Sequence, residues 1–406
     1  MKKIIFMGVM LFTSFLLLAQ EAEKGVRFMD NEPWENVLKK AREQNRWVFV
    51  DCYTTWCGPC KILATEILTQ EKLGQFINEH CISVKYDVEK GTGLDFARKH
   101  RDYIHAFPTM LLVRPDDSVM QCMIGASPAE DILYAVQNGL DGISWQTLEK
   151  KYRAGNREFS FIKNYLNLLA ISGEDARCQA VANDYLKCIP TDSLLNKEIW
   201  DMVEVYIQSP ESQEFQFILH NLHLFAARGF NRYDLEWKLA INTYYRISDI
   251  IKTGFKTENR DTIAHLRKKL TFLDTLLRNP VKDFPKYLAY VRTEMSYLNR
   301  DTEELLNRLI YLGENNLFEN QEWEKAWAEY LIDHLADKKQ IKRCVEYLYR
   351  LQKNREVNND WIVLNCYDVL AKGYKRLKDK PQMEECLRAS ERLNKRNQEI
   401  MKDFNF

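Results

Sequence analysis

The stretch 47-WVFVDCYTTWCGPCKILATEIL-68 decides the fold of this chain. Residues 47–53 are mostly apolar, β-branched or aromatic, which predicts a buried strand. Residues 61–68 show the apolar spacing of a helix. Cys57 and Cys60 therefore lie at a strand-to-helix junction, where unpaired backbone N–H groups and the helix dipole stabilise a thiolate. We expect this pair to be a redox-active dithiol.

A metal site is the alternative interpretation of two cysteines at this spacing. A structural zinc site needs a second Cys or His pair at ligand spacing, and the sequence offers no such pair. His220 and His223 could share a helix face, but no third ligand is near them in sequence. We therefore predict no metal site and no cofactor beyond the disulfide that Cys57 and Cys60 can form.

Residues 25–142 resemble the thioredoxin family. Trp56-Cys57-Gly58-Pro59-Cys60-Lys61 matches the active-site sequence of that family. Further matches are the buried carboxylate at Asp51, the strand lysine at Lys85, the cis-proline loop at Phe107-Pro108-Thr109 and the glycine before the last helix at Gly125. The resemblance implies an α/β thioredoxin fold, in which helices flank a central mixed sheet.

The resemblance also implies a role for each matched residue. Cys57 is the expected nucleophile, Cys60 the resolving cysteine, and Asp51 the proton acceptor for Cys60, with Lys85 beside it. The expected substrate-binding residues are Trp56, Gly58, Pro59, Phe107, Pro108, Thr109 and Gly125. A helix-like entry at 34–41 is expected to replace the usual first strand and helix of the small cytosolic thioredoxins. With the longer segments on both sides of Lys85, it makes this region more similar to periplasmic thiol:disulfide interchange proteins.

The N-terminus predicts export. Residues 1–20 combine a basic start, an apolar core and a polar exit, as a cleavable signal peptide does. We therefore expect a periplasmic or otherwise exported protein; an uncleaved membrane anchor is the alternative. No later segment is as long and apolar, so we predict no integral membrane domain in the mature chain. Lys+Arg and Asp+Glu are balanced at 58 each, which argues against a nucleic-acid partner.

The mature chain is predicted to have two domains, a thioredoxin-like domain at 21–142 and an all-α domain at 146–406. In the first, strand and helix signals alternate, a hairpin is expected at 109–124, and Ser127 to Glu130 read as a capping box with proline at the first helical position. In the second, amphipathic helical patterns are nearly continuous.

An internal similarity in the second half indicates a helical repeat. Residues 335–344 recur as 377–386, a period of 42, and 169–178 are a weaker third copy. This period suits a tetratricopeptide-like helix–turn–helix array, which exposes a groove for protein segments. A plain helical bundle without a binding role is the alternative.

Ten cysteines in an exported chain raise the possibility of structural disulfides. Seven of the others lie within strand or helix patterns and are expected to be small buried apolar residues: Cys52, Cys81, Cys122, Cys178, Cys344, Cys366 and Cys386.

Two functions fit these patterns. The first is an exported thiol–disulfide oxidoreductase that reduces or isomerises disulfides in client proteins, supplied with electrons by a separate membrane or soluble donor. The second is a helical-repeat adaptor or scaffold whose thioredoxin-like domain mainly binds partners.

Overall fold

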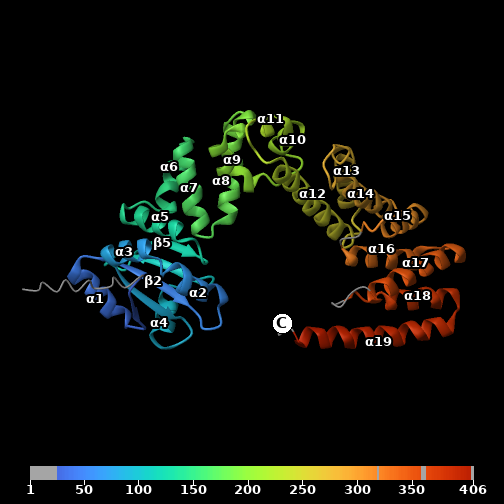
Figure 1. Ribbon diagram of the computed structural model, residues 1–406, viewed down its shortest axis with the longest axis horizontal. Helices are drawn as coiled ribbons and strands as arrows, with labels where there is room; N and C mark the ends of the chain where they lie inside the picture. The colour runs from blue at the N-terminus through green and yellow to red at the C-terminus, as the bar shows by residue number, and fades with distance from the viewer. Residues whose placement is uncertain (1–24, 318–319, 358–362, 404–406) are drawn as a thin grey trace, which may run out of the picture. The chain divides into compact units, whose positions relative to one another are not determined.

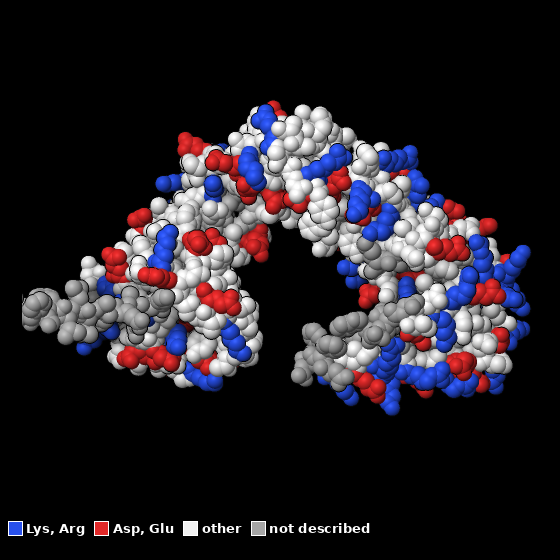
Figure 2. Space-filling view, viewed as in Figure 1, with Lys and Arg blue, Asp and Glu red and all other residues white. Residues whose placement is uncertain are grey.

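The computed structural model describes residues 25–317, 320–357 and 363–403; the signal peptide predicted at 1–20 lies outside them. The chain forms two compact units (Figure 1). The first unit contains the described residues up to Ser193 together with Glu198–Tyr206, and the second contains Leu194–Lys197 and the described residues from Ile207 onward. On the face shown in Figure 2, acidic and basic side chains are interspersed on both units.

A five-stranded mixed sheet with the order β1-β3-β2-β4-β5 forms the centre of the first unit. β1, β3 and β2 are parallel, whereas β4 runs antiparallel to β2 and β5 antiparallel to β4. The predicted thioredoxin fold is therefore confirmed. The strands are β1 (Phe28–Asp30), β2 (Trp47–Tyr53), β3 (Cys81–Asp87), β4 (Thr109–Val113) and β5 (Val119–Ile124).

Helices cover both faces of this sheet (Figure 1). Alternate residues of a strand point to opposite faces, so Val48, Val50 and Cys52 share one face and pack with residues of α1 and α4 in one apolar core. The intervening Asp51 faces the other side. The helices of the sheet domain are α1 (Trp34–Gln44), α2 (Gly58–Ile62), a π-helical turn (Leu63–Ile67), α3 (Glu71–His80), α4 (Gly91–Lys99) and α5 (Ala129–Leu140).

Three local predictions need correction. β1 is present although a helix was expected to replace the first strand. The helix expected at 61–68 is α2 followed by the π-helical turn, in which the N–H of Leu68 donates to the carbonyl of Leu63 at 2.9 Å. The prediction of a capping box at Ser127 is wrong. Pro128 is the N-cap residue of α5, so Ser127 lies one residue before the position from which its side chain could cap the helix.

The helices between α5 and Tyr206 also belong to the first unit, apart from residues Leu194–Lys197. Their bounds are α6 (Trp145–Arg153), α7 (Phe159–Ile171), α8 (Asp175–Cys188) and α9 (Lys197–Val203), with 3-10 turns at Thr191–Leu195 and Glu204–Tyr206. Tyr134 of α5 donates its hydroxyl to Asn164 of α7 at 2.5 Å. The strands end before residue 142, as predicted, but the boundary between compact units lies some fifty residues later than the predicted domain boundary.

The described part of the second unit is built of helices. They are α10 (Gln213–His220), α11 (Leu222–Ala227), α12 (Arg232–Gly254), α13 (Arg260–Leu276), α14 (Phe284–Leu298), α15 (Thr302–Glu314), α16 (Gln321–His334), α17 (Lys338–Val357), α18 (Tyr367–Leu377) and α19 (Lys380–Asp403). Among the described residues, no helix combines the length and the apolar character needed to cross a bilayer.

The two clear copies of the repeat occupy equivalent places in this unit. Leu335 follows α16 and Leu377 ends α18, so each copy forms the turn into the next helix. Cys344 and Cys386 are buried in the second helix of each pair. The helix–turn–helix period of 42 residues is therefore present in this pair, and the tetratricopeptide-like assignment stays a prediction.

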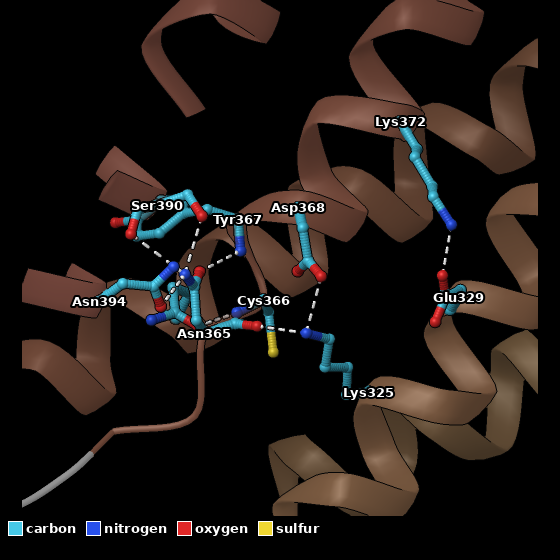
Figure 3. A network of polar contacts seen from close by, with 10 residues as sticks. Lys325, Glu329, Asn365, Cys366, Tyr367, Asp368, Lys372, Ser390 and Asn394 are labelled. Carbon is cyan, nitrogen blue, oxygen red and sulfur yellow. Dashed lines mark hydrogen bonds and ion pairs between the residues drawn. The ribbon is translucent and has the colours of Figure 1, made fainter. Parts of the chain in front are cut away.

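Polar contacts join α16, α18 and α19 (Figure 3). Lys325 of α16 donates to the backbone carbonyl of Asn365 at 2.7 Å and to the carboxylate of Asp368 at 2.8 Å. The Asn365 side chain in turn donates to Ser390 and Asn394 of α19, each at 2.8 Å. These bonds fix the start of α18 between its two neighbours.

A buried carboxyl lies in the core of the second unit. Glu294 of α14 is fully buried and accepts a hydrogen bond from the Trp327 indole at 2.9 Å, while no described residue bonds to its Oε1 atom. Burial raises the pKa of Glu294 well above its usual range, although the Trp327 bond opposes this rise. Gly254 makes room for the carboxyl, because a Cβ atom there would lie 2.3 Å from Oε1.

Candidate redox site

The two cysteines lie where β2 gives way to α2. Cys57 is the N-cap residue of α2, and its sulfur accepts the backbone N–H of Cys60 at 3.1 Å. The two sulfurs form a disulfide across a Cα–Cα distance of 5.3 Å. Cys57 is 3% and Cys60 5% exposed. The first N–H groups of a helix have no intrahelical partner, so this position can stabilise negative charge on the Cys57 sulfur.

The residues between the cysteines suit the start of a helix. Gly58 is the first residue of α2, and Pro59 is the second. Proline fits there because the N–H it lacks would have no partner within the helix. Both residues are exposed, so they border the disulfide on its solvent side.

A buried carboxyl lies on the central strand close to this junction. Asp51 of β2 is 4% exposed, and its Oδ1 atom has no hydrogen-bond partner among the described residues. It stands opposite Lys85 of β3 in the parallel register and opposite Met110 of β4. Burial raises the pKa of Asp51 to about 7, against the opposing charge of Lys85. Asp51 can therefore hold or release a proton near neutral pH.

The predicted cis-proline loop is present. The Phe107–Pro108 peptide bond is cis. The Thr109 hydroxyl donates to the carbonyl of Ala106 at 2.6 Å, and the N–H of Gly125 donates to the carbonyl of Pro108 at 2.9 Å. Gly125 has φ +87°, a conformation that favours glycine. The start of β4 and the end of β5 are thus bonded into one wall.

Trp56 connects this wall to the cysteines. Its side chain is 66% exposed and meets the Phe107 ring edge to face, with the ring centroids 6.1 Å apart. The indole N–H donates to both carboxylate oxygens of Glu89, at 3.0 and 3.1 Å. Sequence reasoning missed Glu89. The parallel pairing of β2 with β3 was the available signal, because it brings the segments after both strands to one edge of the sheet.

The other cysteines lie in a different environment. All eight are free thiols. Six of the seven that were expected to be buried are buried, while Cys122 is half-buried; Cys188 is exposed. Burial raises the pKa of both Cys122 and Cys344 to about 12. These thiols stay protonated at neutral pH and are weak nucleophiles.

The described residues contain no group of three or more His, Cys, Asp or Glu side chains that could hold a metal ion. Among the predicted site residues, Asp51 pairs in register with Lys85, Trp56 meets Phe107, and Gly125 bonds to Pro108. Their catalytic and binding roles stay predictions.

Known proteins resemble the sheet domain. A family profile described as Thioredoxin-like matches residues 30–115. The chain is 36% identical over 86 residues to Thioredoxin-1 of Saccharomyces cerevisiae, a match that covers 21% of this chain and 75% of that protein. It is also 36% identical over 91 residues to Thioredoxin-2 of Pyricularia oryzae, covering 22% of this chain and 48% of that protein.

A solution structure from Bacteroides thetaiotaomicron, described as a proposed disulphide isomerase, is 33% identical, with a TM-score of 0.26; the match covers 29% of this chain and 94% of that one. The chain spans about half the length of the first curated relatives that it matches. At the level of the family, these relatives support a thiol–disulfide oxidoreductase. Through residues 30–115, the chain belongs to the thioredoxin family.

Proposed function

We propose that this protein is an exported thiol–disulfide oxidoreductase that reduces or isomerises disulfides in client proteins. The observation that carries the proposal is the hydrogen bond from the Cys60 backbone N–H to the Cys57 sulfur at 3.1 Å. When the disulfide is reduced, the same N–H can donate to a Cys57 thiolate. A charge-assisted bond of this kind lowers the pKa of the thiol and favours the nucleophilic form.

The first chemical step forms a mixed disulfide. The Cys57 thiolate attacks one sulfur of the client disulfide, an S–S bond forms between Cys57 and the client, and the client S–S bond breaks. The second client sulfur leaves as a thiolate and takes a proton from water. Trp56 and the Phe107–Pro108 wall border the position where the client chain must lie.

The second step releases the client and requires Cys60 to lose its proton. Asp51, with a pKa of about 7, is suited to accept that proton near neutral pH. The Cys60 thiolate then attacks the Cys57 sulfur, the Cys57–Cys60 bond forms as the bond between Cys57 and the client breaks, and the client sulfur leaves as a thiolate that takes a proton from water. Two electrons have moved from the protein to the client. A separate dithiol donor must reduce Cys57–Cys60 before another cycle.

Export is proposed from the sequence pattern of residues 1–20. Mass spectrometry of the protein purified from its native cell should find the mature chain starting near Glu21. Recovery of intact Met1 from a cytosolic fraction would contradict export without affecting the proposed chemistry.

Insulin reduction in the presence of dithiothreitol tests the chemistry. Cys57→Ser should abolish activity, and Cys188→Ser, which removes an exposed thiol outside the site, should retain it. In stopped-flow measurements, Asp51→Asn should slow the release of the mixed disulfide more than its formation. Undiminished activity in Cys57→Ser would disprove the assigned nucleophile, whereas a wild type that does not reduce insulin would favour the adaptor function.

A further inference from the structure

The last strand of the sheet is held from its outer side by the turn between α7 and α8. In the described part of the chain, β5 pairs with β4 and has no strand on its other side. The Ser172 hydroxyl donates to the carbonyl of Cys122 in β5 at 2.8 Å. Ser172 is 7% exposed, so this bond is shielded from water. The turn thus fixes a backbone group of the strand directly.

The next residue of the turn fits closely against β5. Gly173 has φ +70°, and a Cβ atom built on it would lie 3.2 Å from Cδ1 of Ile124. A larger residue at this position would be strained by its backbone conformation and would press on Ile124. Ser172 therefore bonds to Cys122, and Gly173 packs against Ile124, two positions further along β5.

These contacts lie one residue away from the wall of the redox site. Ile124 is the register partner of Thr109, the residue after Pro108. Gly125, which follows Ile124, donates its N–H to the carbonyl of Pro108 at 2.9 Å. A shift of Ile124 would therefore move Gly125 and the loop against which a client segment must bind.

The turn is itself held in place from both sides. On α7, Asn164 accepts the hydroxyl of Tyr134 from α5 at 2.5 Å and donates to Asn138 at 3.4 Å. Beyond the turn, Glu174 forms an ion pair with Arg177 at 3.3 Å. α7 is thus bonded to α5, and the turn that follows α7 contacts β5.

We propose that Ser172 and Gly173 are positioning residues for the client-binding wall of the redox site, so that the helices after the thioredoxin-like sheet help to set which disulfides the protein accepts. The inference rests on the proposed function. A protein disulfide presents an extended chain to the wall, whereas a small disulfide needs access only to the Cys57 sulfur. Loosening the turn should therefore weaken binding of protein disulfides and leave the dithiol chemistry unchanged.

The test compares Ser172→Ala and Gly173→Ala with the wild-type full chain on insulin and on oxidised glutathione. The net contribution of one intramolecular hydrogen bond corresponds to about a fivefold change in an equilibrium constant. Ser172→Ala should therefore raise KM for insulin about fivefold. Its kcat, its rate with oxidised glutathione and its reduction potential should not change. Ser212→Ala is the matched control, because it removes a cap hydrogen bond in the second unit, far in sequence from β5.

Each result bears on the proposal. An unchanged KM for insulin in folded Ser172→Ala would overturn it, and so would an equal loss on insulin and oxidised glutathione. A similar rise in KM in Ser212→Ala would also overturn it, because the effect would then reflect general destabilisation. If Gly173→Ala does not fold, Ser172→Ala still decides the question. Failure of the wild type to reduce either disulfide would contradict the proposed function instead.

Discussion

Replacing Asp51 by Asn should stabilise the folded protein, and increasingly so as the pH rises. The carboxyl is buried inside the central strand, and no described residue bonds to its Oδ1 atom. Its pKa is about 7 in the folded protein, against a usual value of 3.8. Because the folded-state pKa is raised, stability is full below pH 3.8 and is lost progressively as the pH rises toward 7.

The size of the effect follows from the two pKa values. Each pH unit between 3.8 and about 7 corresponds to about 1.4 kcal/mol, so the ionised carboxylate costs the fold about 4 kcal/mol above pH 7. Asp51→Asn keeps the shape of the side chain but carries no charge. The variant should match the wild type near pH 4 and exceed its stability by up to about 4 kcal/mol at pH 8.

Hydrogen exchange followed by mass spectrometry can measure this difference for peptides from β2 and β3. The whole chain has two units, so one unfolding free energy would not describe it, whereas local exchange reports the strands themselves. With the disulfide oxidised in both proteins, protection in Asp51→Asn should exceed that of the wild type by up to about a thousandfold at pH 8. At pH 5, the ratio should be about tenfold.

Asp87 at the end of β3 provides a matched control. It is also 4% exposed, but its hydrogen bond and ion pair with Lys90 lower its pKa. Asp87→Asn should therefore destabilise the protein at neutral pH, and the difference should shrink as the pH falls through the folded-state pKa of Asp87. A protection ratio for Asp51→Asn that is independent of pH, or below one at pH 8, would refute the reasoning.

Two further outcomes are expected. Glu294→Gln should raise the melting temperature of the second unit more at pH 8 than at pH 5 in calorimetry, because burial raises the pKa of this carboxyl and its stability contribution is lost with rising pH; an equal change at both pH values would contradict this. A truncated chain ending at Gly142 would uncover β5 and should aggregate, whereas one ending at Tyr206 should melt cooperatively as a monomer. Size-exclusion chromatography and calorimetry distinguish these two outcomes. A stable monomer ending at Gly142 would show that the helices are dispensable for the sheet.

Local sequence was sufficient for the centre of the site. β2 pairs with β3 on one side and β4 on the other, and its residues form an almost continuous apolar run that predicts a buried strand. The cysteine motif then marks the start of the helix that follows. β1 was missed because it has only three residues, none of them fully buried, and because β3 is its one partner among the described strands. Its stability comes from residues more than fifty positions later, which no local pattern records.

The same reason explains the missed polar partners. Glu89 lies 33 residues from the Trp56 indole that it binds, and Ser172 lies 50 residues from Cys122. Neither residue belongs to a motif, and each acquires its partner only through the sheet topology. Hydrogen bonds between α5 and α7 also join helices on opposite sides of the predicted domain boundary.

Substitutions at positions 254 and 294, which are 40 residues apart, should depend on one another, because the Glu294 carboxyl occupies the space that Gly254 leaves. A Cβ at position 254 would lie 2.3 Å from Oε1 of Glu294, so an alanine there requires this buried side chain to shift or to be shortened. Shortening the glutamate first removes the close contact. The cost of Gly254→Ala should therefore be smaller in a Glu294→Ala background than in the wild type.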